Sequence, residues 1–132
     1  MRIPGVLAEE MLAHCRAALP NEGCGLLAGD EQGIRKVYCL ANADASPVGY
    51  TIDPTGHFAA IQDAEQNGLD LIGAFHSHVN GAAYPSPTDV SGAAEPDWVW
   101  LVAGPMEGSP DLRAYRIRDG VISEEGLEIV DG

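Results

Sequence analysis

Basic side chains and long apolar runs are scarce in this sequence of 132 residues. It has 7 Lys and Arg residues against 20 Asp and Glu, a formal net charge of -13, and Lys36 is its single lysine. Because proteins that bind nucleic acid use Lys and Arg to displace the counterions of the phosphates, this charge argues against a nucleic-acid partner. No apolar run approaches the ~20 residues of a membrane-spanning helix, so the sequence indicates a soluble globular protein without a membrane partner.

Cysteines are also few, and their spacing forms no recognisable pattern. Cys15, Cys24 and Cys39 are an odd number, and they match neither a C-x-x-C motif nor a disulfide framework. We therefore expect free, buried thiols. The N-terminal segment is interrupted early by Glu9 and Glu10, and it lacks the apolar stretch and cleavage site of a secretory signal. These features predict a cytoplasmic protein.

The length suits one compact domain, which we expect to span residues 1–132. Apolar residues recur at helical spacing over residues 6–19, and Pro20 ends that first predicted helix. A second helix is predicted to begin with Asp53 as its cap and Pro54 at its first position. Its predicted apolar face consists of Phe58, Ala59, Ile61 and Ala64.

Strands are predicted where short apolar segments lie between turn residues. These segments are residues 23–29, 37–40, 69–78, 98–102 and 112–117, with residues 121–130 completing the sheet. A short helix is predicted from Ser86 to about Ala94, before Pro96. The mixture of strands and helices, without a repeat or a linker, indicates an α/β or mixed α+β fold in a single domain.

Two histidines lie at the end of the predicted strand 69–78. Side chains at positions i and i+2 of a strand project from one face, with α-carbons ~6.6 Å apart, so His76 and His78 can converge on one ion. The loop of residues 79–85 can reverse the chain and bring Asp89 back over the strand end. Two imidazoles and one carboxylate leave a fourth position open, which is typical of catalytic zinc.

A catalytic metal also needs a base that accepts a proton from its bound water, whose pKa falls to ~7. Glu22 is the candidate base. Each signal has a plainer interpretation when it is taken alone, since Ser86-x-x-Asp89 is also the form of a helix capping box. A His-x-His pair need not bind metal either. His14 and His57 have no partner pattern, and we assign them structural roles.

The candidate residues also occur in one fixed order and spacing. A glutamate precedes the segment Gly23–Leu27, and a string of the form H-x-H-x(7)-S-x-x-D follows. This pattern resembles the signature of the JAMM (MPN+, Mov34/MPN/PAD-1-like) metallopeptidases of the short prokaryotic type. The similarity covers roughly residues 1–118, and Val79 departs from it where many members have proline. The residues that carry the resemblance are Glu22, His76, His78, Ser86 and Asp89.

The resemblance implies a curved mixed β-sheet flanked by helices, with a cytidine-deaminase-like architecture. It also implies a Zn²⁺ ion bound by His76, His78 and Asp89. In similar proteins the glutamate, here Glu22, activates the water, and the serine, here Ser86, helps to stabilise the oxyanion. The implied reaction is hydrolysis of an amide or isopeptide bond at the C-terminal tail of a ubiquitin-like or sulfur-carrier protein.

Two alternatives stay open at this point. A non-catalytic MPN-type module could serve as a scaffold in a larger assembly, and a site of two histidines and one carboxylate also suits iron or manganese. Other metal-dependent classes are excluded, because the H-E-x-x-H motif and the zinc-deaminase motif are absent and the chain is shorter than the ~250 residues of a (β/α)₈ barrel. The sequence gives no signal for an oligomeric state.

Overall fold

The computed structural model describes residues 1–131, and within that range it has three α-helices and eight β-strands. Six strands form a mixed sheet in the order β3-β2-β4-β5-β6-β7, in which β4 and β5 are parallel and the other neighbours are antiparallel. The strands of this sheet are β2 (Cys24–Asp30), β3 (Gly33–Leu40), β4 (Asp70–Ser77), β5 (Val99–Gly104), β6 (Asp111–Arg118) and β7 (Val121–Glu125). The helices are α1 (Gly5–Ala18), α2 (Pro54–Gln66) and α3 (Pro87–Gly92).

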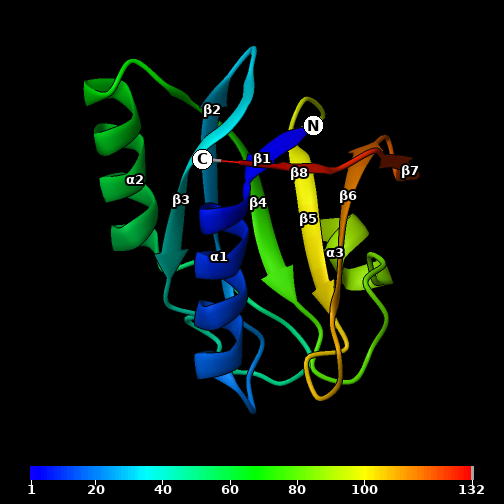
Figure 1. Ribbon diagram of the computed structural model, residues 1–132. Coiled ribbons are helices and arrows are strands. Elements are labelled where there is room, and N and C mark those ends of the chain that lie inside the picture. The colour runs from blue at the N-terminus through cyan, green and yellow to red at the C-terminus, as the bar shows by residue number, and fades with distance from the viewer. Residues whose placement is uncertain (132) are drawn as a thin grey trace.

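The expected mixed sheet flanked by helices is confirmed, and helices cover both of its faces. In Figure 1, α1 lies in front of the sheet, α3 lies behind it and α2 lies along the β3 side. The expected domain of residues 1–132 ends at Gly132, which lies outside the described residues. Within residues 1–131, none of the helices has the length and apolar character that crossing a membrane requires.

The hydrophobic core consists of one cluster on each face of the sheet. Because side chains alternate along a strand, neighbouring residues belong to different clusters. Leu27 and Phe75 pack with α1, whereas Leu26 and Ala74 pack with Trp100 and α2. Strand β4 therefore contributes to both halves of the core.

Helix α2 begins as predicted, but the prediction of its apolar face was wrong in part. The carboxylate of Asp53 accepts a hydrogen bond from the N–H of Gly56, which makes Asp53 the N-cap. Phe58 is 61% exposed and Ile61 is 37% exposed, whereas the small residues Ala60 and Ala64 are buried against the sheet. Alanines let a helix approach a sheet closely, so the size of the side chains, and not only their hydrophobicity, determined the buried face.

The end of the chain also differs from the prediction. Strand β7 completes the sheet, but β8 (Glu128–Val130) leaves it and pairs in parallel with β1 (Arg2–Pro4), a strand that the sequence did not predict. Figure 1 shows these two terminal strands side by side. Ile3 is fully buried in the α1 cluster, and the N-terminal amine donates a hydrogen bond to the carbonyl of Gly126 at 2.8 Å. The burial of Ile3 and this hydrogen bond hold the pairing together. Both depend on residues far apart in the sequence, so local patterns did not predict it.

Candidate metal centre

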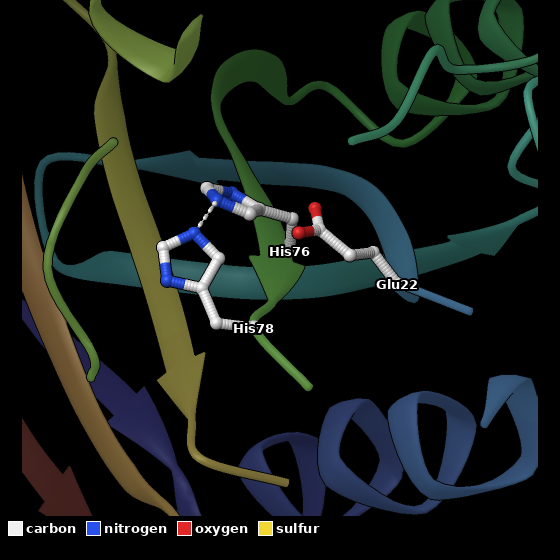
Figure 2. A group of neighbouring side chains, drawn as sticks. All are labelled: Glu22, His76 and His78. Atoms are coloured by element: carbon white, nitrogen blue, oxygen red, sulfur yellow. Dashed lines mark hydrogen bonds between the residues drawn. The ribbon is translucent and has the colours of Figure 1, made fainter. Parts of the chain in front are cut away.

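Two imidazoles meet at the C-terminal end of β4. His76 belongs to the strand, and His78 follows it but continues its direction, because its backbone N–H donates to the carbonyl of Ala103 on β5 at 2.7 Å. The two side chains therefore project from the same face, as the spacing predicts. Their Nε2 atoms lie 3.1 Å apart, and the exposed fractions are 2% for His76 and 8% for His78. Figure 2 shows the two rings turned towards each other.

Asp89 reaches the imidazoles from the first turn of α3. The Ser86 hydroxyl accepts a hydrogen bond from the N–H of Asp89 at 3.1 Å, and Oδ2 of Asp89 accepts one from the N–H of Ser86 at 2.8 Å. The same Oδ2 atom lies 3.0 Å from Nε2 of His76 and 3.1 Å from Nε2 of His78. The capping box therefore fixes the helix start and directs the carboxylate to the histidines at the same time.

The three donor atoms fit a tetrahedral metal site. Ligands ~2.0–2.1 Å from a zinc ion lie about 3.3 Å from one another, and the observed spacings of 3.0–3.1 Å differ from that value by a few tenths of an ångström. Nδ1 of His78 donates to the carbonyl of Ala82 at 2.8 Å, which leaves the Nε2 lone pair free in the neutral ring. Two imidazole nitrogens and one carboxylate oxygen are a donor set that zinc prefers.

The electrostatics of the cluster favour an ionised aspartate beside a neutral histidine. Burial raises the pKa of Asp89, but hydrogen bonds with His76 and His78 and with the Ser86 N–H outweigh burial and hold that pKa below its usual range. Burial lowers the pKa of His76, while the hydrogen bond with Asp89 raises the pKa of His78. The ionised Asp89 and the neutral His76 are in the protonation states that ligate a divalent cation, whereas His78 would give up the proton that Asp89 favours when a metal binds.

Glu22 completes the cluster from a different segment of the chain. One oxygen of its carboxylate and one nitrogen of each imidazole all lie within 4.8 Å of one another, and Figure 2 shows the carboxylate facing His76. Glu22 is 5% exposed, and among residues 1–131 its Oε1 atom has no hydrogen-bond partner. Burial raises the pKa of Glu22 from its ordinary value of 4.5 to about 7, with a smaller lowering by His78 and a smaller rise from Asp89. Such a carboxyl group can gain and lose a proton near neutral pH.

The backbone of Glu22 is held on both sides. Its N–H donates to the carbonyl of Ser46 at 2.9 Å, and the side-chain amide of Asn42 donates to its carbonyl at 3.0 Å. The next residue, Gly23, donates its N–H to the Ser77 hydroxyl at 2.8 Å. A β-carbon on Gly23 would lie 2.8 Å from the α-carbon of Cys15, so only glycine allows α1 to pack this closely. Glu22 itself lies just before β2.

Sequence reasoning missed Tyr50 as a neighbour of the site. Its ring stacks on the His76 ring, with centroids 4.6 Å apart and an angle of 22° between the planes. Burial, Asp89, Cys24 and Glu22 all raise the pKa of Tyr50, so its hydroxyl stays protonated. Tyr50 lies in the irregular segment between β3 and α2, where no local pattern predicts which element a side chain contacts.

His14 and the three cysteines have structural positions. Nε2 of His14 lies 3.1 Å from the carbonyl oxygen of Cys24 and 2.9 Å from that of Leu40, as expected for a structural histidine. In the described chain the cysteines are free as predicted, with Cys15 and Cys24 buried and Cys39 partly exposed. Burial raises the pKa of the Cys24 thiol to about 12, which keeps it protonated and unreactive.

Comparison with known proteins identifies the family. A family profile described as prokaryotic homologs of the JAB domain matches residues 4–118, so the chain belongs to that family. The resemblance to the JAMM/MPN+ proteins is thereby confirmed.

Two relatives and one solved structure are similar over most of the chain. The chain is 36% identical to the CysO-cysteine peptidase of Mycobacterium tuberculosis, over 95% of this chain and 88% of the relative. It is 35% identical to a probable TtuB-protein conjugate cleaving protease of Thermus thermophilus, over 89% of this chain and 76% of the relative. The solution structure of protein DSY2949 from Desulfitobacterium hafniense superimposes with a TM-score of 0.90 at 35% identity, over 99% of this chain and 93% of that chain.

Proposed function

We propose that this protein is a zinc-dependent metallopeptidase. It hydrolyses an amide or isopeptide bond at the C-terminal tail of a ubiquitin-like or sulfur-carrier protein. One observation carries the proposal, namely the three donor atoms of His76, His78 and Asp89 at 3.0–3.1 Å from one another. The relatives named for cleaving CysO-cysteine and TtuB-protein conjugates support this class of substrate.

His76, His78 and Asp89 would hold the metal, and Glu22 and Ser86 would act on the reacting groups. When bound, zinc supplies a Lewis acid that polarises a carbonyl group and makes water more acidic. Glu22 accepts the proton from the attacking water, since its carboxylate lies within 4.8 Å of the imidazole nitrogens and one water can bridge such a distance. It then returns the proton to the leaving amine.

The Ser86 hydroxyl is placed to stabilise negative charge on the substrate. It uses a lone pair to accept the N–H of Asp89, so its own hydrogen remains available for donation. A donor that is fixed before the reaction stabilises a developing oxyanion without reorganisation. Because the capping box fixes this residue, its structural and chemical roles coexist.

The same geometry favours the enzyme over a scaffold. A buried carboxylate oxygen without a partner costs free energy, and an interaction module would gain nothing from it. Glu22 Oε1 and His76 Nδ1 are both buried and without a hydrogen-bond partner among residues 1–131. We also place the protein in the cytoplasm, which the free cysteines support because thiols stay reduced there.

The function is tested with two carrier substrates. Zinc-loaded protein is incubated with a sulfur-carrier protein extended by cysteine and with a ubiquitin-like protein joined to a lysine side chain. Mass spectrometry then identifies the bond that breaks. We expect cleavage directly after the carrier tail of at least one substrate, loss of cleavage with a chelator, and recovery with zinc. Recovery with iron or manganese but not zinc contradicts the metal assignment, and no cleavage of either substrate contradicts the proposed function.

A further inference from the structure

An apolar cavity lies beside the metal centre on the same face of the sheet. Its volume is about 370 Å³, and its floor includes Leu26, Ala74 and Trp100. These residues are direct neighbours across β2, β4 and β5. Ala74 precedes His76 by two residues on β4, so both side chains point to this face. The floor of the cavity therefore begins two residues before His76 on the same face of β4.

The walls join the cavity to the metal centre. They include Tyr50, Ile52, His57, Asp89, Gly92 and Trp98. Tyr50 stacks on His76, and Asp89 lies within 3.1 Å of both imidazoles, so these two side chains line the cavity and the centre at once. When a peptide substrate places its scissile carbonyl group at the metal centre, one of its neighbouring side chains can reach this cavity.

We propose that this cavity binds an apolar side chain of the substrate close to the scissile bond, an inference that rests on the proposed peptidase function. The volume of about 370 Å³ is in the range of ligand pockets, and the surface of the lining is mainly apolar. It contains no lysine or arginine, and its one carboxylate, Asp89, is engaged by the imidazoles. The cavity therefore favours an apolar side chain, such as leucine, over an acidic one or over glycine.

Two glycines at the wall make the proposal testable without disturbing the fold. A β-carbon at Gly92 or at Gly49 would meet no atom within 4 Å, and neither residue has a left-handed backbone conformation. The β-carbon of a leucine at either position therefore meets no backbone, and because both glycines line the cavity, the added side chain should reduce its volume. Gly126, between β7 and β8, has the same freedom but does not line the cavity, so Gly126→Leu is the matched control.

Tryptophan fluorescence measures occupancy directly. The sequence has two tryptophans, Trp98 and Trp100, and both line the cavity. The zinc-loaded Glu22→Gln variant, which we expect to bind without cleaving, is titrated with acetyl-Gly-Gly-Leu-Gly-Gly-amide and with the corresponding all-glycine peptide. We expect a saturable change in emission with the leucine peptide, at an affinity about tenfold or more above that of the glycine peptide, because a buried leucine gains at least that much.

The glycine variants decide where the peptide binds. Adding Gly92→Leu or Gly49→Leu to the Glu22→Gln protein should weaken binding of the leucine peptide by about tenfold or more, while Gly126→Leu should leave it unchanged. Circular dichroism and zinc content verify that each variant is folded and loaded. The inference is overturned if the two peptides bind equally, if neither changes the emission, or if all three leucine variants behave alike. Because binding is measured without turnover, this result is independent of whether the carrier substrates are cleaved.

Discussion

The two faces of the central sheet differ in what they bury. Strand β4 directs Phe75 and Ser77 to the α1 face and Ala74 and His76 to the opposite face. On the α1 face, large side chains such as Met11 fill the core. On the opposite face the small side chain of Ala74 leaves space, and the cavity of about 370 Å³ lies there beside the imidazoles. One strand therefore contributes to the packed core on one side and to the proposed metal centre on the other.

The difference extends to buried polar groups. Ser77, on the α1 face, is fully buried, and its hydroxyl accepts the N–H of Gly23. On the other face, within residues 1–131, the buried atoms Glu22 Oε1, His76 Nδ1 and Trp100 Nε1 have no hydrogen-bond partner. An unsatisfied buried group costs about 1–3 kcal/mol. These three unpartnered atoms therefore lie around the proposed metal centre and the cavity beside it, where the fold accepts their cost.

The largest predicted effect concerns Glu22. Replacing Glu22 by Gln removes the base but keeps the volume of the side chain, so turnover should fall by about 10²–10⁴-fold. Zinc content should not change, because the donor atoms of His76, His78 and Asp89 are untouched. Steady-state kinetics on the cleaved carrier substrate give the turnover number, and elemental analysis gives the zinc content. Full activity in this variant would show that another group accepts the proton.

The next largest effect is a loss of stability when a side chain is removed from the core on the α1 face. Phe75 is buried in the α1 cluster, so Phe75→Ala should lower the free energy of unfolding by about 3–5 kcal/mol. Ile52, at the cavity wall, is only half-buried, and Ile52→Ala should cost about 1 kcal/mol. Urea denaturation of the zinc-loaded proteins measures both changes. Equal losses would remove the distinction between the two faces.

A smaller effect depends on pH and concerns the metal-free protein. The folded-state pKa of Glu22 is raised from 4.5 to about 7, so the protonated carboxyl group is favoured by folding. Its contribution is fully present below pH 4.5 and is lost as pH rises towards 7. Relative to Glu22→Gln, the metal-free wild type should lose on the order of 3 kcal/mol over this interval. Urea denaturation of both metal-free proteins at several pH values measures the difference, and a difference that does not vary with pH contradicts the raised pKa.

The last predicted effect concerns the hydrogen bond between Ser77, on the α1 face, and Gly23, which follows Glu22. Ser77→Ala leaves the N–H of Gly23 buried without its acceptor, which should cost about 1–2 kcal/mol of stability. Because Gly23 follows Glu22, turnover should fall as well, while zinc binding is retained. Ser77→Thr keeps a hydroxyl group and should restore part of both. A stability loss without any change in turnover would show that this hydrogen bond does not position Glu22.

Local patterns predicted the elements that have local signals. Asp53 and Pro54 marked the start of α2. Short apolar segments between turn residues located the six strands of the main sheet. The fixed spacing of histidines and aspartate also predicted which side chains would meet at the end of β4. In each case the signal lies within about fifteen residues of sequence.

The features that sequence missed depend on contacts between distant segments. The pairing of β1 with β8 joins the two ends of the chain, and Tyr50 reaches His76 from an irregular segment. The buried face of α2 depends on how closely Ala60 and Ala64 approach the sheet. The cavity is assembled from β-strands, two helices and a loop, so no stretch of sequence encodes it alone.

The central claim is tested most directly by measuring bound metal. Protein purified without added metal and then equilibrated with zinc is analysed for zinc per chain, for the wild type and for His76→Ala, Asp89→Asn and Glu22→Gln. The account predicts about one zinc per chain in the wild type and in Glu22→Gln, none in His76→Ala, and weakened binding in Asp89→Asn. A wild type that folds without binding zinc, or a His76→Ala variant that retains it, would contradict the account.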